Sequence, residues 1–139
     1  MAGVAAGVYL FPLLGGVRMS HVVQIQTQVR DAAAVRAGCK RLELDEPVER
    51  EVKLFSETVR GLAVQLRDWR YPVVFRTETG ETKFDNYEGH WGKQERLDEF
   101  LQVYAVEKTK IEARRNGYSV TEQSLKDGSI KLSLTSGAG

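Results

Sequence analysis

His21 and His90 are the only histidines in the 139-residue chain, so any histidine-based chemistry must use one of them. His90 stands in the stretch NYEGHWGK, where two glycines flank a histidine and a tryptophan. A zinc or iron site there would add the carboxylate of Asp85 or Glu88 to the two imidazoles. These carboxylates precede His90 at a spacing that matches no recognised ligand pattern. We therefore expect no metal and no cofactor, and keep a small enzyme or metal protein centred on His90 as an alternative.

The candidate nucleophiles give weaker support for catalysis. Ser20 and His21 are adjacent in the sequence and cannot pair as they do in a catalytic triad without a long turn. Cys39 falls on the apolar stripe of an expected helix, which indicates a buried small hydrophobe rather than a reactive thiol. The glycine and lysine spacing of a P-loop is absent. No catalytic residue is predicted.

Arginines and aromatic residues alternate in the stretch RDWRYPVVFR, which contains Arg67, Trp69, Arg70, Tyr71, Phe75 and Arg76. An exposed sheet surface of this composition is typical of single-strand nucleic-acid binders, on which bases stack. However, 20 basic and 19 acidic residues give a net charge of only +1, and no ribonucleoprotein motif is present. Nucleic-acid binding is therefore an alternative and not the favoured prediction.

The composition predicts one globular domain, because 139 residues fit the usual domain size and 42% of them are hydrophobic. A single cysteine excludes an internal disulfide and suits a reducing compartment, so we expect a cytoplasmic protein. The balanced charge gives no reason to expect a membrane partner.

The first eighteen residues, MAGVAAGVYLFPLLGGVR, are apolar and carry no charge before Arg18. A signal peptide would begin with positive charge, and Pro12 and the shortness of the run argue against a membrane span. Met19 begins a stretch that looks like a natural start. We expect residues 1–18 to be a disordered leader or to lie upstream of the native start, with export and membrane anchoring as alternatives. The domain then comprises residues 19–135, followed by a flexible tail at 136–139.

Hydrophobic patterning predicts the element order β-α-β-β-β-β-α-β-β. An alternating strand at 21–29 leads to Asp31, a helix N-cap for residues 32–44. A long amphipathic helix runs from Gln94 to Asn116, where Gly117 follows as a C-cap. The remaining strands are expected at 48–55, 61–66, 73–77 and 82–87, with a closing hairpin at 118–134.

Short connections between these strands imply antiparallel pairing, and two helices suffice to cover one face of a sheet. We therefore predict an α+β fold: a two-layer sandwich with a mainly antiparallel sheet and two helices on one face. A ferredoxin-like arrangement with extra strands is one form of it. Two helices cannot cover both faces of a six- or seven-stranded sheet. The row Gln24, Gln26 and Gln28 is therefore expected on the uncovered face, or at an edge that another chain could extend.

Both ends of residues 19–135 resemble a known family, whereas the middle fits only loosely. The matching features are Ser20-His21 before the first strand, Asp31, Tyr104-Ala105, Ala113, Gly117-Tyr118 and Asp127-Gly128-Ser129-Ile130. They resemble the domain-of-unknown-function family 1257, small conserved hypothetical proteins of cyanobacteria, red-algal plastids and other bacteria. The resemblance implies a small cytoplasmic or stromal protein encoded near AAA-type ATPases, and hence an adaptor or accessory role. It implies no catalytic residues.

The favoured prediction is accordingly a protein-binding accessory protein whose partner is an ATPase or a second copy of itself. The stretch NYEGHWGK is interpreted as a structural turn, with Trp91 folded back as a plug over the end of the core and Tyr87 beside it. The residues expected on a partner or ligand surface are His21, Gln24, Gln26, Gln28, Trp69, Arg70, Tyr71, His90 and Trp91.

Overall fold

The computed structural model describes residues 5–10, 17–19, 22–25 and 28–136, with side chains from residue 28 onward. The strands are β1 (Ala5–Leu10), β2 (Val17–Met19), β3 (Val22–Ile25), β4 (Val48–Lys53), β5 (Thr58–Val64), β6 (Val73–Arg76), β7 (Glu81–Asp85), β8 (Tyr118–Ser124) and β9 (Ile130–Ser136). The helices are α1 (Ala32–Arg41), α2 (Gln94–Arg115) and a short 3₁₀ turn, η1 (Tyr87–Gly89). From β3 onward this confirms the predicted order and the α+β class.

Two antiparallel sheets are present in the described part of the chain. One has the order β2-β3-β7-β6-β5-β4 and the other the order β1-β9-β8. β1 and most of β2 fall within residues 1–18, for which we expected a disordered leader or an upstream position. The location of the native start stays a prediction.

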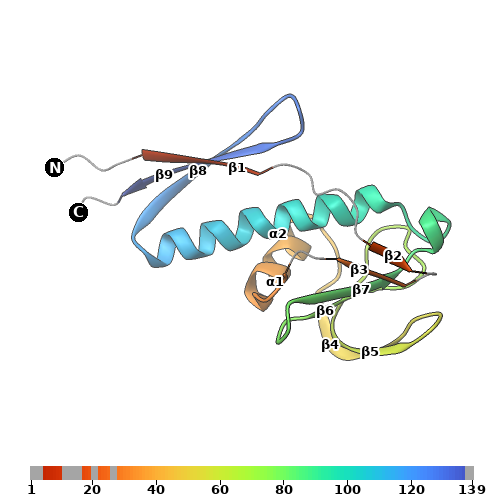
Figure 1. Cartoon of the computed structure of the whole chain (residues 1–139). Helices are drawn as coiled ribbons and strands as arrows, with labels where there is room; N and C mark the ends of the chain where they lie inside the picture. The colour runs from red at the N-terminus through yellow and green to blue at the C-terminus, as the bar shows by residue number, and fades with distance from the viewer. Residues whose placement is uncertain (1–4, 11–16, 20–21, 26–27, 137–139) are drawn as a thin grey trace.

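The closing hairpin β8–β9 does not join the six-stranded sheet but lies on the other side of α2 (Figure 1). The reason is the length of α2. Its 22 residues span about 33 Å, whereas β6 and β7, with four and five residues, span only about half of that. The chain therefore leaves α2 well beyond the sheet. A small cluster of Val106, Ile130 and Leu132 fixes the hairpin on the helix.

The main core lies between the two helices and the six-stranded sheet. Phe75 of β6 stacks on Phe100 of α2, with ring centroids 5.4 Å apart. Asp31 caps α1 as predicted, because its carboxylate accepts a hydrogen bond from the Ala34 N–H at 3.1 Å. The Tyr104 hydroxyl accepts further bonds from the backbone N–H groups of Arg30 and Asp31, and so ties the start of α1 to α2.

The face of the sheet away from the helices is covered in part by the β4–β5 hairpin. Val74 points to this face and is fully buried in a second cluster with Val52, Leu54, Val59 and Ala63. Gly61 permits the close approach, since a Cβ there would lie 2.7 Å from Val74 Cγ1. We expected this whole face to be uncovered, and that was wrong. β5 extends beyond the residues that pair with β6, and together with β4 it folds back over the sheet (Figure 1).

An ion pair holds the tip of the curled hairpin in place. Lys83 of β7 donates to the Glu57 carboxylate, in the β4–β5 turn, at 2.8 Å. β6 lies between β5 and β7 in the sheet, so the β4–β5 turn must cross β6 to bring Glu57 to Lys83. As a result, Phe55 in the same turn reaches the segment that follows β7.

Candidate functional site

Six side chains from three loop segments meet at this end of the sheet. We call them the Trp91 surface: Phe55, Arg70, Tyr71, Tyr87, His90 and Trp91. Phe55 comes from the β4–β5 turn, Arg70 and Tyr71 from the β5–β6 loop, and the other three from η1 and the turn after it. Four of the six were predicted as partner-surface residues, namely Arg70, Tyr71, His90 and Trp91.

Backbone contacts fix the two longer segments against each other. The Arg70 N–H donates to the Trp91 carbonyl at 2.8 Å, and the Trp69 indole N–H donates to the Lys93 carbonyl at 3.1 Å. Gly92 lies flat on the Trp69 ring, since a Cβ there would be 2.6 Å from Trp69 Cε2. Trp69 is therefore the buried foundation of the surface and is only 5% exposed.

The η1 turn presents its side chains through an unusual backbone. Tyr87 and Glu88 have φ values of 46° and 52°, in the left-handed region that few residues other than glycine adopt. The Asn86 carbonyl accepts hydrogen bonds from the Gly89 and Trp91 N–H groups at 3.0 and 2.9 Å, which holds this turn closed. Such strain persists only where surrounding structure enforces it and is common at functional sites.

Trp91 is the centre of the ring cluster. The ring centroids of Tyr87, Phe55 and Tyr71 lie 4.8, 5.3 and 5.7 Å from it, at interplanar angles of 80°, 50° and 64°. The Arg70 guanidinium lies over the Trp91 ring at 4.9 Å and over Tyr71 at 5.6 Å. These are the tilted geometries that aromatic pairs prefer, together with a cation–π contact.

The Trp91 surface is open to solvent. Phe55 is 58% exposed and Tyr87 is 37% exposed, while Tyr71 and Trp91 are half-buried. Trp91 is thus not the plug of the core that we predicted. Trp69 occupies that position, packed edge-on against Phe84 with ring centroids 5.5 Å apart.

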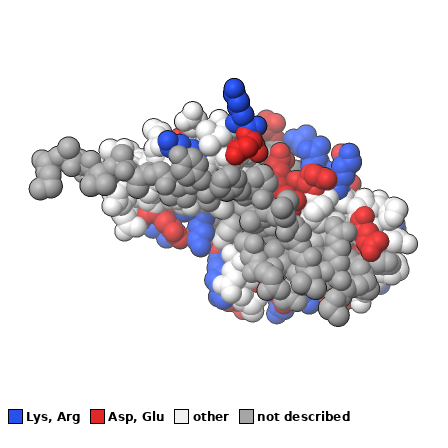
Figure 2. Space-filling view, turned by 45° about the horizontal axis from the view of Figure 1, so that its top comes forward, with Lys and Arg blue, Asp and Glu red and all other residues white. Residues whose placement is uncertain are grey.

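The predicted stacking platform for nucleic acid is not assembled. Trp69 and Phe75 are buried in the core, and Arg76 forms an ion pair with Glu81 at 3.0 Å. Arg67 donates to the Leu42 carbonyl instead. Figure 2 shows basic and acidic side chains interspersed over the described part of one face, without the basic stripe that nucleic-acid binders usually carry.

The structure locates part of the hypothetical histidine site and the candidate nucleophilic cysteine. His90 is exposed and packs on the Tyr87 ring at 4.9 Å, whereas Asp85 is fully buried. Within the described residues, no group of three His, Cys, Asp or Glu side chains is arranged to hold a metal ion. Burial raises the pKa of the Cys39 thiol to about 11, so this residue is an inert core side chain, as predicted.

The structure describes only two of the three glutamines in the predicted row, and it does not describe His21. His21 and Gln26 lie outside the described residues. Gln24 pairs with Lys83 in the β3–β7 ladder. Gln28 is exposed and accepts a hydrogen bond from the Arg30 side chain at 3.0 Å, beside the β6–β7 turn. Gln28 is therefore remote from the Trp91 surface, which adjoins the opposite ends of β6 and β7.

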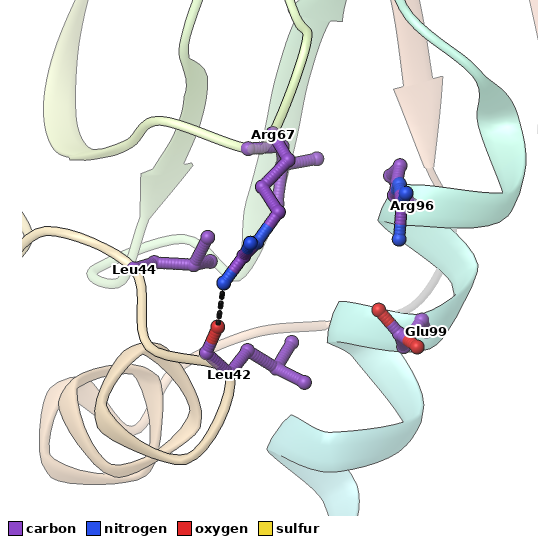
Figure 3. A pocket seen from close by; sticks show the side chains of 6 residues that line it. Leu42, Leu44, Arg67, Arg96 and Glu99 are labelled. Carbon is purple, nitrogen blue, oxygen red and sulfur yellow. Dashed lines mark hydrogen bonds between the residues drawn. The ribbon is translucent and has the colours of Figure 1, made fainter.

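A small cleft between the end of α1, the start of α2 and the β5–β6 loop is lined by Leu42, Leu44, Leu66, Arg67, Arg96 and Glu99 (Figure 3). Its volume is about 40 Å³, far below the several hundred Å³ of a metabolite pocket. Arg67 spans one side of it through its bond to the Leu42 carbonyl. A cleft of this volume does not define an enzyme site.

The fold and this site together define a small α+β protein with an exposed aromatic surface on its loops. No protein-family model, no curated protein and no solved structure matches the chain. The resemblance to family 1257 therefore stays a prediction. Among the described residues, neither helix combines the length and apolar composition needed to cross a bilayer.

Proposed function

We propose that this chain is a protein-binding accessory protein of the cytoplasm, and that the Trp91 surface is its docking site. The observation that supports this most is the position of Arg70. Arg70 is exposed and its guanidinium lies over two aromatic rings, and it forms no ion pair with any residue of the described part of the chain. Trp, Tyr and Arg are enriched among the few residues that supply most of the binding energy at protein interfaces.

The distribution of exposed apolar side chains also supports the proposal. Among the described residues, four large hydrophobic side chains are exposed, namely Val48, Phe55, Tyr87 and Tyr118. Two of the four belong to the Trp91 surface, where two further rings adjoin them. A grouped aromatic patch is typical of an interaction site, whereas single exposed apolar residues are normal on any surface.

The partner to test first is an AAA-type ATPase, because of the resemblance to family 1257, and the second is another copy of this chain. The capture experiment uses the tagged full chain in a lysate of the source organism. Phe55→Ser with Tyr87→Ser is the test variant, and Val48→Ser with Tyr118→Ser is its matched control. Both pairs remove one aliphatic or phenyl side chain and one tyrosine of similar exposure.

We expect a protein that the wild type and the control variant retain and the test variant loses. Equal retention by both variants would contradict the proposal. Self-association is distinguished by sedimentation of purified protein, where the test variant, but not the control, should sediment as a monomer.

Single-stranded nucleic acid is the second candidate, because Arg70 and Tyr71 remain together on an exposed surface. Binding of a fluorescent oligonucleotide would have to weaken strongly with added salt and depend on Arg70. The tilted rings around Trp91 favour protein over stacked bases.

A further inference from the structure

The shape of the Trp91 surface restricts the kind of segment that can bind there. Its rings meet Trp91 at 50° to 80°, so they form walls around the indole rather than one flat platform. The corners at which these tilted rings meet suit compact apolar rings. Large flat groups such as bases require a parallel face.

Two common modes of peptide recognition fit this surface poorly. A peptide that adds a strand must pair with a sheet edge, but the edges of the six-stranded sheet are β2 and β4. Most of the Trp91 surface instead adjoins the interior strands β6 and β7, through Tyr71 and Tyr87, and Phe55 lies in the turn after β4 rather than on that edge strand. An amphipathic helix about 10 Å wide requires a long apolar groove, whereas these aromatic side chains project from three separate loops.

A polyproline II segment matches the surface better. Its pyrrolidine rings are compact and apolar, and such segments dock on surfaces lined by aromatic side chains. Its backbone carbonyls make no bonds within the segment and need external donors. The Tyr71 hydroxyl supplies such a donor beside the rings, which leaves the Arg70 guanidinium for a side chain of the ligand.

Arg70 adds a charge requirement. Its guanidinium forms no ion pair in the described part of the chain, including with the exposed Glu88 of the neighbouring η1 turn. A cation held on an aromatic face still presents its N–H groups at the edge of the ring to an approaching carboxylate. The complementary ligand therefore carries an acidic side chain.

Resting on the function proposed above, we infer that the Trp91 surface binds an extended, proline-containing segment that bears a carboxylate. The prolines pack against the rings of Phe55, Tyr71 and Trp91, in the corners at which these rings meet. The carboxylate pairs with Arg70.

Synthetic peptides test this directly on the full chain, by titration calorimetry or tryptophan fluorescence. The first peptide carries glutamate at every third position in a proline background, so that its carboxylates share one face of the polyproline II helix. The second is proline throughout. The third has the same glutamates in a glycine–serine background.

We expect the first peptide to bind about tenfold tighter than the third, because proline is already ordered in the bound conformation. Arg70→Gln should weaken binding of the first peptide about three- to fivefold and leave the second unchanged. Arg67→Gln, which removes a nearby arginine that contacts no ring, should change neither. Phe55→Ser should weaken the binding of both proline peptides. Because Phe55 is exposed, loss of folding would not explain that result.

Equal binding of the first and third peptides, or an Arg70→Gln effect no larger than that of Arg67→Gln, would overturn the inference. If the capture experiment shows a partner lost with the test variant while no proline peptide binds, the docking surface stands and the proline segment is wrong. If an amphipathic helical peptide or an oligonucleotide competes at this surface and the proline peptides do not, the inference is likewise wrong.

Discussion

Two charged regions of this molecule use arginine in opposite ways. Where α1, α2 and β8 meet, Arg41 pairs with Glu107 at 3.1 Å and forms two further hydrogen bonds to Glu122. Lys110 pairs with the same two carboxylates at 3.3 and 3.5 Å. At the Trp91 surface, Arg70 lies on aromatic rings and forms no ion pair in the described part of the chain.

The difference separates charges that hold the fold together from a charge that is open to a partner. The network of Arg41, Glu107, Lys110 and Glu122 is balanced, two cations against two anions, and connects the C-terminal hairpin to both helices. Its charged groups already pair with one another, which leaves little charge for a ligand to bind. The Trp91 surface has an unbalanced cation and exposed rings, and its foundation is a separate buried residue, Trp69. Three substitutions should affect these two regions differently.

The largest expected effect comes from Gly92→Ala, which removes the space that the Trp69 ring occupies. The new methyl group would overlap the indole, and the ring would have to move and lose its bond to the Lys93 carbonyl. We expect the free energy of unfolding to fall by about 2–3 kcal/mol, measured by chemical denaturation.

Gly89→Ala is the matched control for that substitution. Gly89 has φ of +97°, and beyond its chain neighbours no atom lies within 4 Å of the position that a Cβ would take, so an added methyl meets only backbone strain. We expect a loss of about 1–2 kcal/mol, smaller than at Gly92. A larger loss at Gly89 than at Gly92 would show that Trp69 is not the foundation of the surface.

Arg41→Met should have the next largest effect. It leaves the carboxylates of Glu107 and Glu122 to Lys110 alone, and because these side chains are partly exposed we expect about 1 kcal/mol of lost stability. Binding at the Trp91 surface should be unchanged. A loss of binding in this variant would contradict the separation of the two regions.

The pH dependence of that loss has a definite sign. The hydrogen bond from Arg41 lowers the pKa of Glu122 below its ordinary value of 4.5, so the folded state holds this carboxylate ionised more strongly than the unfolded state. This contribution is present above the unfolded pKa and is lost as the pH falls through the folded pKa. Wild type and Arg41→Met should therefore differ more at about pH 7 than at about pH 3, by denaturation at both.

The smallest effect on stability is expected for Phe55→Ser. The ring is 58% exposed, so its removal should change the free energy of unfolding by no more than about 0.5 kcal/mol. The same change should remove most partner binding, because it removes one of the exposed rings that contact Trp91. Calorimetric melting together with a capture assay checks both halves of this prediction.

Local patterning predicted most elements of the fold. Alternation marked the strands, Asp31 marked the start of α1, and Asn116-Gly117 marked the end of α2, where Gly117 has φ of +81°. The curl of the β4–β5 hairpin was missed because it depends on a contact between Gly61 and Val74, thirteen residues apart in sequence and on different strands. Local periodicity carries no signal for such a bend.

The site was predicted in part for a similar reason. Arg70, Tyr71, His90 and Trp91 were visible as unusual residues near turns, and the fold brings them together. Trp69 was expected on the surface but is buried, and Trp91, for which both a plug and a surface position were predicted, lies on the surface. Sequence does not show which ring a glycine such as Gly92 will face. Phe55 was missed as a surface residue because it read as the apolar end of a strand, and only the hairpin curl brings it to Trp91.

The most direct measurement is the affinity of the captured partner for four purified single variants beside wild type, by titration calorimetry. The structure predicts that Phe55→Ser and Arg70→Gln each weaken binding about fivefold or more, whereas Val48→Ser and Arg67→Gln leave it unchanged. Equal affinities for all four variants would contradict the assignment of the Trp91 surface as the docking site.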